Sequence, residues 1–182
     1  QQFLNDTGLD PTLTYKDGPK LTTLVNGIIS KTTGVDGLVK VCNARQKFYN
    51  GMGRSYEMCI NRIAIYGLGD TTIVNARFIE HLFRQLQFEC AGGFPIWADN
   101  RACIILADSK TNCLANFNGT LYGTSTSNFC TQNMQDMLNC VQSDYKTYCP
   151  GTQQRVAGWF ACERERLGWA ADCTTLVCDT NA

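Results

Sequence analysis

The feature that most constrains the fold is a run of nine cysteines in the second half of the chain, from Cys90 to Cys178. They lie 5 to 17 residues apart, and no two of them form a Cys-x-x-Cys pair. Structural zinc sites usually contain such closely spaced ligand pairs, whereas disulfides join cysteines at any separation. The spacing therefore favours disulfides between helices and disfavours a metal site.

Composition narrows the class of protein further. The chain has 11 cysteines in 182 residues, a content that is rare where thiols are kept reduced. Its 16 basic and 16 acidic residues balance, so nothing indicates a nucleic acid or an anionic membrane surface as partner. The longest apolar run is about five residues, and a bilayer-spanning helix needs roughly 20. We therefore expect a secreted, extracellular protein without a membrane span.

Hydrophobic residues recur with helical periodicity along most of the chain, which predicts an all-α fold. We expect a single domain, 1–182, built as a disulfide-stapled bundle of about six or seven helices. Residues 1–18 are predicted to be an irregular lead-in, 118–128 an exposed loop and 174–182 a tail. Gly34 is expected to close the first helix, and Asp70 or Thr71 to cap the fourth. The helices are predicted near residues 19–34, 36–49, 54–66, 71–90, 96–117, 129–148 and 153–173.

The cysteine count is odd, so at least one is left over when the others pair. Cys178, in the predicted tail, is the leading candidate for an unpaired or intermolecular cysteine, although a buried free thiol is the alternative. Cys140 and Cys149 are nine positions apart and point to opposite sides of one helix, which can then be stapled on two flanks. Connectivity cannot be read from the sequence. The candidates for disulfides are Cys42, Cys59, Cys90, Cys103, Cys113, Cys130, Cys140, Cys149, Cys162 and Cys173.

Two Asn-x-Thr sequons predict N-linked glycans at Asn5 and Asn118. The first lies in the predicted lead-in and the second at the start of the predicted loop. Both settings are expected to be exposed, so both asparagines are accessible to a glycan.

The residues give no pattern of an enzyme. His81 is the single histidine, and we interpret it as a partly exposed helix position rather than a catalytic residue or a metal ligand. The chain has no His-Glu-x-x-His motif, no Gly-x-Ser-x-Gly elbow and no EF-hand loop. We expect no catalytic residue, no metal and no cofactor. The aromatic residues Trp159, Phe160 and Trp169 are interpreted as core, with a ligand pocket as the alternative.

Several short segments match a known pattern of cysteines and helices. They are Leu86-Gln87-Phe88-Glu89-Cys90, Cys103, Cys113, Phe129-Cys130, Met137-Leu138-Asn139-Cys140 and Cys149, with Cys42 and Cys59 as further matches. On these residues the chain resembles the secreted cysteine-rich helical domains that are expanded in nematodes. One set is a domain of unknown function, and a related set occurs in chondroitin proteoglycans of the egg. The resemblance covers roughly residues 38 to 175 and implies an extracellular, non-catalytic, disulfide-bonded helical module. Chondroitin chains attach at Ser-Gly, which this chain lacks, so a proteoglycan core role is not expected.

Three functions fit these observations. The first is a non-catalytic extracellular structural or interaction protein, disulfide-rich and N-glycosylated, which binds another extracellular protein or assembles with itself into covalent oligomers or filaments. The second is a carrier of a small apolar ligand such as a lipid. The third is a secreted effector that binds a host or surface receptor.

Overall fold

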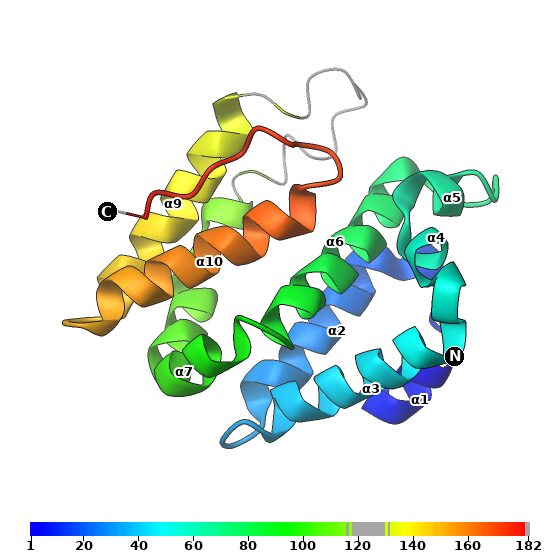
Figure 1. Cartoon of the computed structure of the whole chain (residues 1–182), viewed down its shortest axis with the longest axis horizontal. Helices are drawn as coiled ribbons and strands as arrows, with labels where there is room; N and C mark the ends of the chain where they lie inside the picture. Colours follow the sequence, from blue (N-terminus) through cyan, green and yellow to red (C-terminus); the bar gives the residue numbers. More distant parts are fainter. Residues whose placement is uncertain (116, 118–129, 131, 181–182) are drawn as a thin grey trace. The chain divides into compact units, whose positions relative to one another are not determined.

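The computed structural model describes residues 1–115, 117, 130 and 132–180. Within these residues the chain forms α-helices and two short 3-10 helices but no strand, and ten of the 11 cysteines form five disulfides. The prediction of a disulfide-stapled all-α bundle is confirmed. Contacts divide the chain into two compact units, Gln1–Cys90 and Ala91–Ala182 (Figure 1). Among the described helices, none is long and apolar enough to cross a membrane.

The first unit is built around three longer helices, of which α2 packs against both α3 and α6. Short helices cover the ends of this core (Figure 1). The elements in order are α1 (Gln2–Thr7), η1 (Tyr15–Asp17), α2 (Gly18–Lys31), α3 (Asp36–Met52), η2 (Gly53–Ser55), α4 (Tyr56–Ile60), α5 (Arg62–Tyr66) and α6 (Ile73–Glu89).

The predicted irregular lead-in is wrong, because residues 1–18 contain α1 and η1. Helix α1 has only six residues, too few to be stable alone, and tertiary packing holds it. Phe3 and Leu4 are buried, and α1 packs on α3. In η1, the side chain of Thr14 caps the helix, and Asp17 accepts a hydrogen bond from the Thr14 backbone N–H. A six-residue helix gives almost no periodic signal, so the sequence pattern did not indicate it.

The third predicted helix, 54–66, is broken at Asn61 into α4 and α5. Asn61 has an extended backbone (φ −70°, ψ 126°), and its side chain accepts hydrogen bonds from the N–H groups of Ile63 and Ala64. Asparagine favours such a cap over the interior of a helix because its side chain competes for backbone donors. The predicted single helix therefore becomes two short ones.

Three other predicted helix ends move by a few residues. Helix α2 ends at Lys31, so Gly34 lies in the following turn with φ +62° rather than at the cap. Thr72, not Asp70 or Thr71, caps α6 by accepting a hydrogen bond from the Asn75 N–H. The fifth predicted helix ends at Lys110 instead of residue 117, since Thr111 has an extended backbone.

An aromatic cluster fills the core of the first unit. The ring of Phe83 on α6 contacts those of Phe3, Phe48 and Tyr56, with centroids 5.2 to 6.4 Å apart. The pairs with Phe3 and Tyr56 are edge-to-face, and such pairs contribute about 0.5–1.5 kcal/mol each beyond area burial. The Cys42–Cys90 disulfide joins α3 to the residue that follows α6. One disulfide and this cluster therefore hold α1, α3, α4 and α6 together.

The second unit consists of α7 (Phe94–Lys110), α9 (Gln132–Tyr148) and α10 (Gln153–Trp169), followed by the tail. Helices α9 and α10 pack along their length (Figure 1). Gly158 permits this approach, because a Cβ there would lie 2.9 Å from the carbonyl oxygen of Gln142 on α9. Four disulfides cross-link the unit: Cys103–Cys149, Cys113–Cys140, Cys130–Cys173 and Cys162–Cys178.

A polar group centred on the buried Tyr145 joins α7, α9 and α10. The hydroxyl of Tyr145 on α9 donates a hydrogen bond to the Asp108 carboxylate on α7. Arg164 on α10 donates to both, at 2.8 Å from the Tyr145 hydroxyl and 3.0 Å from Asp108 Oδ1. The Tyr145 side chain is fully buried, and its burial raises the pKa of the phenol well above the usual value. The group therefore fixes the helices relative to one another through charge-assisted hydrogen bonds.

Candidate interaction surface around Cys59

Cys59 is the cysteine left over when the others pair, and it is exposed. The prediction that Cys178 is unpaired is wrong: Cys178 is bonded to Cys162 on α10. The prediction of Cys59 as a disulfide candidate is wrong for the same reason, because the other nine candidates and Cys178 form five pairs without it. The free thiol lies in α4 of the first unit rather than in the tail.

The exposure of Cys59 follows from the way α4 is anchored. Tyr56 and Ile60, one helical turn apart, are buried and hold one face of α4 to the core. Cys59 and its neighbour Met58 lie outside that face and are exposed. The helix predicted near residues 54–66 places Cys59 in its interior, but the break at Asn61 ends α4 at Ile60.

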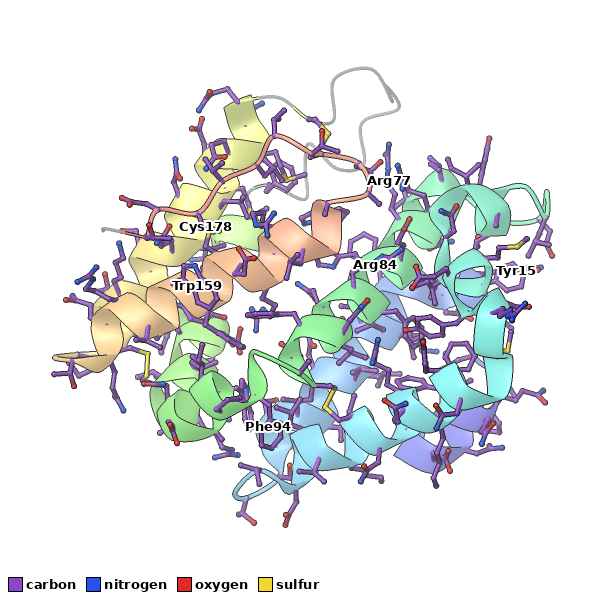
Figure 2. All side chains as sticks on the ribbon, in the orientation of Figure 1. Tyr15, Arg77, Arg84, Phe94, Trp159 and Cys178 are labelled. Carbon is purple, nitrogen blue, oxygen red and sulfur yellow. A yellow bond between two sulfur atoms is a disulfide. The ribbon has the colours of Figure 1, made fainter. Side chains whose placement is uncertain are left out.

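A buried carboxylate fixes α4 and α5 to α6. Glu80 of α6 accepts hydrogen bonds at 3.0 Å from both the backbone N–H and the guanidinium of Arg62, the first residue of α5. Arg84, one turn further along α6, lies 3.5 Å from Glu80 and 2.7 Å from Glu57 of α4. Figure 2 labels Arg84 on α6. Since Glu80 is only 2% exposed, this pairing is little screened by solvent and positions both short helices.

Apolar side chains are exposed on both sides of the thiol in the sequence. Met58 is 69% exposed and Ile63 62%, while Tyr66 and Leu68 are 51% and 61% exposed. Single exposed apolar residues are ordinary, but several in one short stretch of sequence offer apolar area that a partner can cover. We call these four side chains and Cys59 the Cys59 surface.

The chemistry open to this surface is disulfide formation with another thiol. An exposed thiol is oxidised readily in a compartment where disulfides form, whereas a buried one is inert. The apolar side chains add area that a partner can cover. The arrangement therefore favours covalent association.

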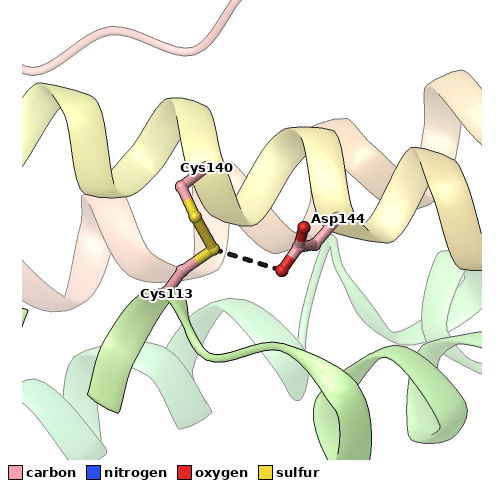
Figure 3. Close-up of side chains that lie close together, drawn as sticks. All are labelled: Cys113, Cys140 and Asp144. Carbon is pink, nitrogen blue, oxygen red and sulfur yellow. Dashed lines mark hydrogen bonds between the residues drawn. A yellow bond between two sulfur atoms is a disulfide. The ribbon is translucent and has the colours of Figure 1, made fainter. Parts of the chain in front are cut away.

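One group outside this surface has the composition of a metal site. Asp144 Oδ2 lies 3.2 Å from the Sγ of Cys113, which is bonded to Cys140 (Figure 3). Metal binding by cysteine needs the thiolate, and a disulfide sulfur is not one. In the oxidised protein the group is therefore a carboxylate packed against a disulfide rather than a metal site.

His81 is buried, contrary to the expectation of a partly exposed position. It lies on α6 in a row with Arg77, Gln85 and Glu89, which are spaced by four residues and are also buried. An amphipathic pattern predicts one buried face, but α6 buries this polar row as well as its apolar stripe. Trp169 and Phe160 are buried in the second unit, as interpreted from the sequence, whereas Trp159 is only partly buried.

Of the two predicted glycosylation sites, Asn5 lies within the described residues and Asn118 does not. Asn5 is exposed on α1, so its side-chain amide is open to a glycan, although the segment is helical rather than irregular. Thr7 of the same sequon is buried, and its hydroxyl donates to the carbonyl oxygens of Phe3 and Leu4. Asn118 and the predicted loop 118–128 lie outside the described residues.

The fold and this surface define a disulfide-stapled all-α protein with one exposed thiol. Comparison of the chain with family models, with curated proteins and with solved structures finds no match. The resemblance to the cysteine-rich domains expanded in nematodes therefore stays a prediction.

Proposed function

We propose that this chain is a secreted, N-glycosylated, non-catalytic structural or interaction protein that forms covalent dimers through Cys59. The observation that carries the proposal is the exposed Cys59 thiol among exposed apolar side chains, in a chain whose other cysteines are paired. Five disulfides support an extracellular location, because reducing compartments disfavour them.

The same thiol on a second copy is the simplest partner. In a twofold-symmetric dimer both chains use the same surface, so the Cys59 residues of the two chains can meet at the symmetry axis. One free cysteine per chain then forms one intermolecular disulfide. The Met58, Ile63, Tyr66 and Leu68 side chains would then face their equivalents. Four side chains expose less apolar area than the roughly 800 Å² per partner that a stable non-covalent interface buries. A covalent bond supplies the stability that this area alone would not.

Carriage of an apolar ligand is less well supported than self-association. Of the aromatic residues that suggested it, Phe160 and Trp169 are buried in the second unit, and in the first unit the Phe83 ring packs against three other rings. These rings serve the core. Receptor binding by an effector has no residue in this structure that favours it over a second copy.

Electrophoresis and light scattering test the proposal. We expect protein secreted from an oxidising compartment to migrate as a dimer without reductant and as a monomer with it. Cys59→Ser should be monomeric in both, with an unchanged circular dichroism spectrum, since the side chain is exposed. A wild-type monomer, or a dimer that persists in Cys59→Ser, would contradict the proposal.

A second pair of variants tests the apolar contribution. Met58→Ser should slow dimer formation several-fold, because it removes the exposed apolar side chain that neighbours the thiol in the sequence. Val156→Ser, which removes an exposed apolar side chain from α10 in the second unit, is the matched control and should not change the rate. Equal rates in all three proteins would show that the thiol acts without the surface.

A further inference from the structure

The tail of the second unit, residues 174–180, is not helical, and two glutamine side chains of α9 bind its backbone. The side-chain amide of Gln135 donates to the carbonyl oxygen of Val177 at 2.8 Å and accepts from its N–H at 3.1 Å. Gln142 makes the same pair of hydrogen bonds with Asp179, at 2.6 and 3.3 Å. Figure 1 shows the tail following α9 and α10, and Figure 2 labels Cys178 within it.

Through these hydrogen bonds, Gln135 and Gln142 recognise an extended peptide backbone. In a strand, the N–H and C=O of one residue point to the same side, and residues two apart repeat that direction. Each glutamine offers one donor and one acceptor, as a neighbouring strand would. Val177 and Asp179 have exposed side chains, so these hydrogen bonds select peptide geometry and not side-chain identity.

The alternate residues of the tail point into the unit. Leu176 is buried, and Cys178 is bonded to Cys162, which is fully buried on α10. Arg155 on α10 donates to the carbonyl oxygen of Thr180 at 3.1 Å. We call the face formed by Gln135, Gln142, Arg155 and Cys162 the tail site. Gln142 is itself only 4% exposed, so a peptide backbone is what satisfies its buried amide.

We infer that the tail site is a peptide-binding site and that it accepts the tail of a second copy in exchange for its own. Every copy carries the segment that fits the site, and exchange reproduces the same contacts between chains, which is the low-cost route to a swapped dimer. Thr174 and Thr175 are exposed and lie between Cys173, which is held by Cys130, and the buried Leu176. These two threonines are the hinge, and because the hinge is short, the exchanging copies lie close together.

Exchange requires opening of the Cys162–Cys178 disulfide, and a small thiol such as glutathione is the co-reactant. Its thiolate attacks the Sγ of Cys178, forms a mixed disulfide there and releases the Cys162 thiolate. The Cys162 thiolate of one copy then attacks the mixed disulfide on Cys178 of the other copy. The small thiolate leaves unchanged. The reciprocal step forms the second bond, so two intramolecular disulfides become two intermolecular ones without net oxidation or reduction.

The exchange is independent of dimerisation through Cys59, because the two bonds lie in different units of the chain. A copy joined to one neighbour through Cys59 and to another through its tail would extend an assembly at both ends. Tail exchange is therefore tested in a Cys59→Ser background, where its failure does not bear on the proposed function.

Complementation between two full-length variants tests the inference. Cys59→Ser/Cys162→Ser keeps a tail with a free Cys178, and Cys59→Ser/Cys178→Ser keeps a site with a free Cys162. Mixed in a glutathione redox buffer, they should yield a heterodimer with one Cys162–Cys178 bond, identified by mass spectrometry of the cross-linked peptides. Absence of that peptide from the mixture, while each variant retains its helical circular dichroism signal, would overturn the inference.

Variants of the site test whether backbone recognition directs the exchange. Adding Gln135→Ala and Gln142→Ala to the site-donating variant should lower the heterodimer yield at least about tenfold, because each lost hydrogen bond changes an equilibrium constant by roughly fivefold. Gln132→Ala is the matched control, since Gln132 bonds only Asp136 in the described hydrogen bonds. An equal yield in all three would show that random thiol collision, and not the site, forms the bond.

Discussion

The two units of this chain are similar in length but are stabilised differently. The unit Gln1–Cys90 has one disulfide and a cluster of aromatic rings centred on Phe83. The unit Ala91–Ala182 has four disulfides and the polar group of Asp108, Tyr145 and Arg164. A unit of about 90 residues buries only a modest share of the surface that its unfolded chain exposes, so additional stabilising interactions matter. The aromatic cluster supplies them in the first unit, and the disulfides supply them in the second.

The difference shows where an unpaired cysteine can be tolerated. In the second unit every cysteine has a partner, and a spare thiol there could exchange with four nearby disulfides. Cys59 instead lies in the unit whose stability depends on packing, on a helix whose buried face it does not share. A free thiol can serve association there with the least risk to the fold.

The largest effect should come from reduction. Each disulfide contributes about 2–4 kcal/mol, so removing four costs the second unit a sum comparable to the whole stability of a typical domain, about 5–15 kcal/mol. We expect the second unit to lose hydrogen-exchange protection after complete reduction and alkylation. The first unit, which loses one disulfide, should keep measurable protection in α3 and α6.

Peptide-level hydrogen exchange monitored by mass spectrometry reports the two units separately. The same protein treated with the alkylating agent but not reduced is the control, since its five intramolecular disulfides stay closed. Equal loss of hydrogen-exchange protection in both units would contradict the proposed difference between them, because it would show that the first unit also depends on its cross-link.

Much of this architecture was predictable from periodicity. The stripes of apolar residues correctly indicated α2, α3, α6, α9 and α10 to within a few residues, because long amphipathic helices repeat their pattern several times. The formation of disulfides was predictable from the number and spacing of the cysteines. The connection α4–Asn61–α5 was missed because a capping asparagine and an interior one look alike in a single sequence.

The prediction that Cys178 is the unpaired cysteine was wrong for a different reason. Division of the chain at Cys90 puts Cys42, Cys59 and Cys90 in the first unit, an odd number, and an even number in the second. Counting by unit would have identified the first unit as the one with a spare thiol. The sequence shows no linker at that boundary, so it indicates only that the whole chain has an odd number of cysteines. The position of Cys178 in the predicted tail then favours it as the unpaired one.

A substitution at Phe83 tests the packing of the first unit. Phe83→Ala should lower the free energy of unfolding by about 3–5 kcal/mol, the usual cost of removing a buried phenylalanine. Loss of protection should concentrate in α1, α3, α4 and α6, whose side chains surround the ring. Tyr66→Ala is the control, since that ring is half exposed and its loss should cost within about 0.5 kcal/mol. Equal costs for the two variants would argue against the aromatic cluster as the core.

The smallest effect should come from Tyr145 in the second unit, and it should depend on pH. At pH 8 Tyr145→Phe should cost about 1.5–3 kcal/mol, because Asp108 and Arg164 lose a partner. Burial raises the pKa of Tyr145 in the folded state above its unfolded value of about 10. The stabilisation of the folded state by the neutral Tyr145 phenol is therefore complete below pH ~10 and is lost as pH rises through the pKa of the folded state.

Denaturant titrations in a Cys59→Ser background, which has no free thiolate to catalyse disulfide exchange, should show this change. The stability difference between Tyr145 and Tyr145→Phe should narrow between pH 10 and 11, because only the protein with the phenol must protonate it to fold. Tyr56, whose pKa is also raised by burial, is present in both proteins and cancels. A constant difference from pH 8 to 11 would mean that the phenol is not held neutral by the second unit. The polar group would then be a surface feature rather than the counterpart of the aromatic core in the first unit.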